Sequence, residues 1–110
     1  AMNATSAMLG FEESEFERFG VAAVPSVVVR PPRVASASVA FECRLDRIIR
    51  VSEGPAGGNI VLGRIVRMHV ADAVIGANGY PDPDRLDLVG RMGGTEYLRT
   101  RDRFSIDRPA

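Results

Sequence analysis

The chain has 110 residues, and its fourteen acidic and fourteen basic residues give a formal net charge of zero. This length suits one domain, and the charge balance excludes a strong field that would attract nucleic acid or an anionic membrane. All the basic residues are arginine, which excludes lysine-dependent chemistry such as a Schiff base or a phosphate-loop lysine. No apolar run approaches the ~20 residues that cross a bilayer, and no signal peptide is visible, so we expect a cytoplasmic protein.

The first third of the sequence predicts short elements separated by turns. Residues 11–20 predict a short helix, because glutamates crowd its start and two phenylalanines three positions apart share a face. Gly20 provides a plausible C-terminal stop for this helix. Residues 21–33 predict an edge strand at the three valines 27–29, because the flanking prolines favour extended backbone.

The middle of the chain predicts a hairpin of two long strands. Residues 38–51 alternate between apolar and polar side chains, and this period of two is typical of a strand with one buried and one solvated face. Residues 52–59 are rich in turn-forming residues, and residues 60–73 predict the second strand. Cys43 lies on the apolar face and is expected to be an inert core residue.

The last third predicts a helical turn and an arginine-rich tail. Residues 83–89 read as one helical turn, with Asp82 as a possible N-cap and Pro83 at the first helical position. Residues 99–110 read as an extended tail with four arginines diluted by two aspartates. A solvated tail is the favoured interpretation, and nucleic-acid binding is the weaker alternative.

These elements amount to a mainly β protein with too few strands to close a barrel or a sandwich. An isolated hairpin is marginal in water, and open strand edges need cover. We therefore expect that the chain either pairs with another chain or forms part of a longer protein.

The chemically reactive side chains are few. His69 and Cys43 are the single histidine and the single cysteine, so no metal site is expected. His69 fits either a hydrogen-bonded strand residue or a proton or hydrogen-bond donor at the mouth of a pocket. Asn3, Thr5 and Ser6 lie in a weakly patterned segment, and they fit either a loop or helix end or a set of small donors near a ligand.

A glycine-rich segment follows the predicted helical turn. It contains Arg91, Gly93 and Gly94, but it matches neither the dinucleotide-binding nor the Walker pattern. One interpretation is a turn that needs a positive φ. The other is a backbone that closely approaches a ligand, with Tyr97 providing an aromatic face.

Taken in order, several segments of the sequence resemble a known family. They are MNATS, VAAVPS, RPPRVASASVAFECRL, GGNIVLGRIVRMHVADAVI and PDRLDLVGRMGGTEYLRTRDRFSIDRP. The ordered set is similar to the second half of the flavin reductase-like, FMN-binding split-barrel proteins. The resemblance implies a mainly β fold, a partial Greek-key split β-barrel with short peripheral helices. Residues 1–110 would form the C-terminal half of such a domain, and the departures are the short length, Ala71 in place of a common aspartate and Leu88 in place of a common proline.

The resemblance also implies a function. It implies a bacterial, cytoplasmic flavoprotein that forms a homodimer or higher oligomer, in which NAD(P)H transfers hydride to bound FMN, with FAD as the alternative flavin. His69 would be the catalytic residue near the flavin or nicotinamide. The implied cofactor-binding residues are Asn3, Thr5, Ser6, Arg91, Gly93, Gly94 and Tyr97. The alternative is a truncated, non-enzymatic split-barrel remnant that acts in oligomerisation or partner binding.

Overall fold

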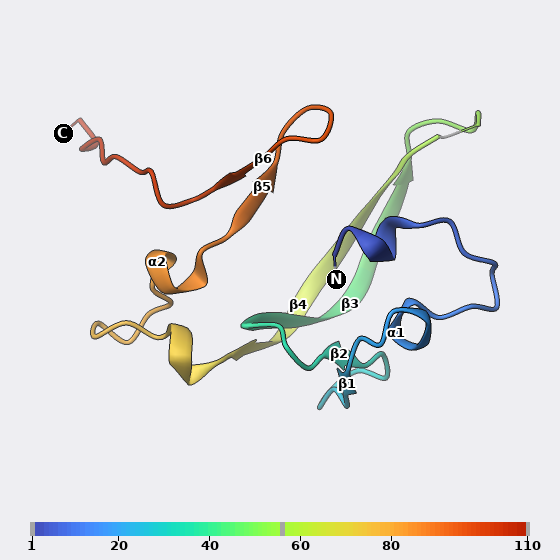
Figure 1. Ribbon diagram of the computed structural model, residues 1–110, viewed down its shortest axis with the longest axis horizontal. Helices are drawn as coiled ribbons and strands as arrows, with labels where there is room; N and C mark the ends of the chain where they lie inside the picture. The colour runs from blue at the N-terminus through green and yellow to red at the C-terminus, as the bar shows by residue number, and fades with distance from the viewer. Residues whose placement is uncertain (1, 56, 110) are drawn as a thin grey trace. The chain divides into compact units, whose positions relative to one another are not determined.

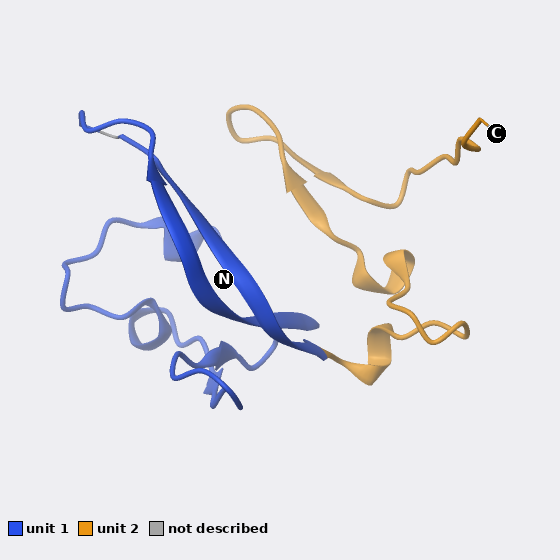
Figure 2. Ribbon diagram, turned by 180° about the vertical axis from the view of Figure 1, so that it is seen from behind, with its two compact units in different colours: residues 1–69 blue, residues 70–110 orange. Residues whose placement is uncertain are grey.

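The computed structural model describes residues 2–55 and 57–109 as two compact units, one within residues 1–69 and the other within residues 70–110 (Figure 2). The elements in chain order are η1 (Ala4–Ser6), α1 (Glu15–Arg18), β1 (Ala23–Val24), β2 (Arg33–Val34), β3 (Val39–Arg50), β4 (Asn59–Val70), η2 (Asp72–Val74), α2 (Pro83–Leu86), β5 (Val89–Arg91) and β6 (Tyr97–Arg99) (Figure 1). Strands pair as β1–β2, β3–β4 and β5–β6. The mainly β fold with short helices is therefore confirmed. Among the described residues, no helix is long and apolar enough to cross a membrane.

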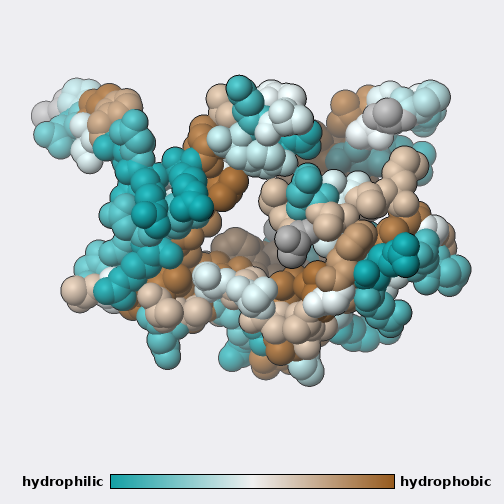
Figure 3. All heavy atoms as spheres, viewed as in Figure 1, coloured by the Kyte–Doolittle hydropathy of each residue, from teal (hydrophilic) through white to brown (hydrophobic). Residues whose placement is uncertain are grey.

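The long hairpin of the first unit matches the two predicted central strands. The strands β3 and β4 each have twelve residues and are hydrogen-bonded neighbours. The expected burial of their apolar face is wrong for this chain, since Phe41 is 51% and Leu45 64% exposed. Figure 3 shows that hydrophobic side chains reach the surface of the protein. Cys43 is also exposed rather than a core residue. A two-stranded sheet buries a face only where a second layer covers it, and the other elements of this unit are short.

The segment before the long hairpin differs from the prediction both in the length of its helix and in the position of its strands. The helix α1 is confined to four residues, and it is followed by Gly20 with a φ of 62°, the left-handed conformation of a C-terminal stop. The predicted strand at residues 27–29 is wrong. Instead, the short strands β1 and β2 pair antiparallel and close a loop at residues 25–32. The three valine amides in this loop have side-chain rather than strand partners.

The second unit contains the predicted helical turn, which spans Pro83–Leu86 and follows η2. In α2, Pro83 is the first residue, and the Asp82 carboxylate accepts hydrogen bonds from the amides of Asp84 (2.8 Å) and Arg85 (3.2 Å). These contacts confirm the predicted N-cap, which satisfies amides that have no partner within the helix.

An aspartate after α2 organises the arginine-rich segment. Asp87 adopts a left-handed φ of 43°, and its carboxylate accepts hydrogen bonds from Arg99 (2.6 Å) and Arg101 (2.8 and 3.0 Å). The Arg101 guanidinium, with Arg99 beside it, holds the pKa of Asp87 below its ordinary value. Arg103 donates to Asp84 in the same way. Three of the four arginines of the predicted solvated tail are therefore anchored to acidic partners.

The glycine-rich segment forms the turn of an unpredicted hairpin. The strands β5 and β6 pair antiparallel, with Arg91 opposite Tyr97. Gly94 in the connecting turn has a φ of 60°, so the expectation of a positive φ is confirmed there. Gly93 has no such conformation, and a Cβ on either glycine would meet no atom within 4 Å.

These two glycines provide a matched test of backbone strain. Gly94→Ala should destabilise the β5–β6 hairpin by about 1 kcal/mol, because a side chain disfavours the left-handed region. Amide hydrogen exchange at Met92, which donates to Glu96 within the hairpin, should then accelerate roughly fivefold. Gly93→Ala should leave that exchange nearly unchanged, and equal effects of the two changes would contradict this assignment.

Candidate functional site

The first unit contains a buried carboxylate. Glu42, on β3, is 1% exposed, although the predicted polar face of its strand is otherwise solvated. Its Oε1 accepts a hydrogen bond from the amide of Val27 (2.8 Å), and its Oε2 accepts from those of Val28 (2.6 Å) and Val29 (3.2 Å). The loop at residues 25–32 is therefore wrapped around one side chain.

The predicted catalytic residue contacts the same carboxylate. His69, near the end of β4, lies with its Nε2 2.6 Å from Glu42 Oε1. The His69 side chain is 22% exposed, so the ring is mostly buried but partly accessible. Of the two interpretations of His69, the structure shows a hydrogen-bonded strand histidine, and this contact does not exclude a role at a site.

An arginine completes this cluster. Arg33, in β2, lies with its Nε 4.0 Å from Glu42 Oε1, and its Nη2 donates to the Pro25 carbonyl (3.3 Å). Among the residues that the structure describes, the buried Nε of Arg33 has no hydrogen-bond partner. Such unpaired buried donors are uncommon in folded proteins and call for an explanation.

Burial alone would raise the pKa of Glu42. The amides of Val27 and Val28 and the His69 ring outweigh this effect, and together they lower its pKa from 4.5 to about 2. The carboxylate is therefore ionised at neutral pH, and an ionised carboxylate can only accept hydrogen bonds.

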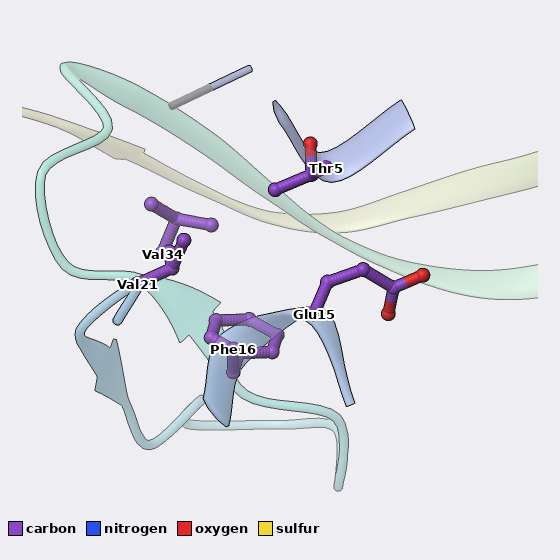
Figure 4. A pocket seen from close by; sticks show the side chains of 5 residues that line it. All are labelled: Thr5, Glu15, Phe16, Val21 and Val34. Atoms are coloured by element: carbon purple, nitrogen blue, oxygen red, sulfur yellow. The ribbon is translucent and has the colours of Figure 1, made fainter. Parts of the chain in front are cut away.

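Of the predicted residues in the N-terminal segment, Thr5 and Ser6 lie on η1 and Asn3 is its N-cap. The Thr5 hydroxyl donates to the Met2 carbonyl and the Ser6 hydroxyl to the Asn3 carbonyl, both at 2.8 Å. Thr5 also lines a cavity of about 290 Å³ together with side chains of α1, β2 and the segment before β1 (Figure 4). The other lining residues are Glu15, Phe16, Val21 and Val34.

The remaining predicted residues lie together in the β5–β6 hairpin. Arg91 and Tyr97 are cross-strand partners, and Gly93 and Gly94 form the turn between them. Tyr97 is 43% exposed and so offers an aromatic face. The predicted residues thus lie in three places. Arg91, Gly93, Gly94 and Tyr97 share the β5–β6 hairpin of the second unit. In the first unit, Asn3, Thr5 and Ser6 lie at η1, and His69 lies near the end of β4.

Sequence reasoning missed Glu42 and Arg33 as members of the His69 cluster. Glu42 was placed on a solvated face because the period of two assigns it there. The available signal was the loop at residues 25–32, where three consecutive amides between prolines need acceptors that a strand partner would otherwise supply.

The low pKa of Glu42 predicts a specific acid sensitivity. Between about 4.5 and about 2, the unfolded state binds more protons at this group than the folded state does. Its stabilising contribution is therefore complete above pH 4.5 and is lost as the pH falls towards 2. The protection factors of the Val27 and Val28 amides, which correct for the intrinsic pH dependence of exchange, should fall across that window. Glu42→Gln should show low protection factors that do not change with pH there, and protection that persists unchanged below pH 2 would contradict the assignment.

Comparison with known proteins places the chain in a family. A family model described as "Flavin reductase like domain" matches residues 1–86. The protein BH2278 of Halalkalibacterium halodurans is 36% identical over 111 residues, which cover 99% of this chain and 53% of the relative. Thus the chain spans about half the length of the curated relatives that it matches.

Solved structures agree with this match. Nitrilotriacetate monooxygenase component B from Bacillus cereus aligns over 96% of this chain and 52% of its own, with a TM-score of 0.85 and 29% identity. A protein with a split barrel domain from Shewanella frigidimarina aligns over 97% of this chain and 53% of its own, with a TM-score of 0.79. At 23% identity, the second likeness shows the fold alone. The chain belongs to the flavin reductase-like family, and its mainly β fold corresponds to about half of the split-barrel structures that it matches.

Proposed function

We propose that this chain contributes to an FMN-binding reductase in which NAD(P)H is the hydride donor. The observation that carries the proposal is the family match over residues 1–86, and this range includes His69 and the η1 segment. FAD is the alternative flavin, and a cytoplasmic location is part of the same proposal.

The residues of this chain suit parts of a flavin. A flavin nucleotide combines an apolar ring, a polar ring edge and an anionic phosphate. The chain offers the exposed Arg91 as a cation, the exposed ring of Tyr97 as an aromatic face and the open backbone at Gly93 and Gly94. The hydroxyls of the η1 segment are less suited to a phosphate, because their protons are already donated to carbonyls.

The size and lining of the cavity beside Thr5 also indicate which part of a flavin it could hold. Its volume of about 290 Å³ lies at the lower end of the roughly 300–1,000 Å³ typical of ligand pockets. Its lining is mostly apolar and includes the Glu15 carboxylate, which would repel a phosphate. This cavity therefore suits an apolar part of a ligand better than its anionic part.

The proposed roles of the side chains follow from their chemistry. The hydride chemistry itself belongs to the bound flavin, and the protein binds and orients it. His69 would contact the flavin or the nicotinamide through the accessible part of its ring. Arg91 would supply positive charge, and Tyr97 would pack against an apolar ring.

The second candidate is a non-enzymatic split-barrel remnant that acts in oligomerisation or partner binding. The observation that favours it is the exposure of apolar side chains along β3 and β4. A surface of this kind on a long hairpin is typical of an interaction site. The two candidates share the expectation of an associated chain and differ in flavin binding.

Flavin binding separates the two candidates. Titration of FMN with the purified chain should quench flavin fluorescence and saturate. Tyr97→Ala should weaken binding roughly two- to tenfold, since aromatic packing is lost. Tyr80→Ala is the matched control, because Tyr80 is 71% exposed and is not among the proposed site residues. A chain that leaves FMN fluorescence unchanged would favour the remnant.

The exposed strands predict association. Light scattering should give a mass of at least twice the 11.9 kDa of one chain, because isolated hairpins with open edges are marginal in water. Arginine substitutions at Leu45 and Ile49, which are 64% and 45% exposed on β3, should lower that mass. A stable, folded monomer would contradict the expectation of a homodimer or higher oligomer.

A further inference from the structure

We propose that Glu42 is a positioning residue, which holds the His69 ring with its proton on Nε2 and presents Nδ1 to a ligand. The inference rests on the proposed function only in its second part, the ligand that meets Nδ1. Its first part concerns two side chains of the first unit and stands on their geometry alone.

The first step is the direction of the hydrogen bond between the two side chains. Glu42 Oε1 lies 2.6 Å from His69 Nε2, and an ionised carboxylate has no proton to donate. Three backbone amides also donate to this carboxylate, and such donors stabilise its ionised form. The proton of this contact therefore resides on Nε2.

The second step concerns the other ring nitrogen. A neutral imidazole carries one proton, so a proton on Nε2 leaves the Nδ1 lone pair free to accept a hydrogen bond. The ligand class that suits this atom has an N–H donor, such as a carboxamide or a ring imide. Both groups occur in the proposed reactants, the carboxamide in nicotinamide and the imide in flavin.

The third step couples the ring to the neighbouring loop. The same carboxylate accepts from the amides of residues 27–29, so one side chain fixes both the loop and the histidine. Arg33, whose Nε lies 4.0 Å from Oε1, is the cation that faces this carboxylate. A change at Glu42 should therefore affect His69 and the loop together.

The acceptor count explains why glutamine cannot replace Glu42. Four donors converge on the two carboxylate oxygens, two on each. A glutamine has one acceptor oxygen and an NH₂ group that only donates. In either orientation, two of the four donors would therefore face another donor.

The test uses the fact that His69 is the single histidine of the chain. In ¹⁵N-labelled protein with a neutral His69 ring, we expect a direct ¹H–¹⁵N correlation at Nε2 and an unprotonated Nδ1. This measurement on the unmodified chain does not depend on any variant folding. A proton on Nδ1, or the absence of a protected ring N–H, would overturn the positioning role.

Two variants sharpen this test. Glu42→Gln should abolish the Nε2–H correlation and weaken FMN binding roughly tenfold or more, which is the scale of losing a hydrogen bond to a charged group. Glu53→Gln is the matched control, because Glu53 is an exposed glutamate of the same unit. An unchanged Nε2–H correlation in Glu42→Gln would overturn the proposal.

Addition of FMN and then NADPH separates this inference from the proposed function. A shift of the Nδ1 signal on saturation with either compound, with the Nε2–H correlation retained, supports the ligand-facing role. An unmoved Nδ1 signal when both compounds are bound would overturn that role. If neither compound binds, the proposed function fails and the ligand-facing part fails with it, while the Nε2–H signal still decides the role of Glu42.

Discussion

Four hydrogen-bond donors converge on one buried carboxylate, and the local structure of the first unit depends on this arrangement. A buried charge is costly unless it is paired and hydrogen-bonded. Glu42 meets this condition with three consecutive loop amides and the His69 ring. The loop at residues 25–32 is therefore held by a side chain instead of by strand pairing, and its position is tied to that of the histidine.

A second constraint is the shortage of apolar cover. Both long strands expose large apolar side chains, and Val74 is the one buried hydrophobic side chain among the described residues. The curated relatives are about twice as long as this chain, so a split-barrel domain of their length has further segments that can form another layer. Association with other chains would supply the same kind of cover. The exposed apolar strands and the greater length of the relatives thus both indicate that β3 and β4 need a covering layer.

The sequence predicted the elements whose signals are local. The alternation along β3 and β4, the Asp82 cap and the positive φ of Gly94 each follow from a few neighbouring residues. Predictions that depended on distant partners were less successful. The strand at residues 27–29 was wrong because Glu42, more than ten positions away, supplies the acceptors. Cys43 was expected in the core because the period of two shows which residues share a face, but not whether another layer covers that face.

The ionisation of Glu42 is the most direct test of this account. The ¹³C signal of its side-chain carboxyl carbon, followed from pH 7 to pH 1.5, reports the protonation of that group alone. The account predicts a midpoint of about 2, because the loop amides and His69 stabilise the charged form. A midpoint near the ordinary value of 4.5 would contradict it, because the carboxylate would then lack the donors that are inferred to fix both the loop and the histidine.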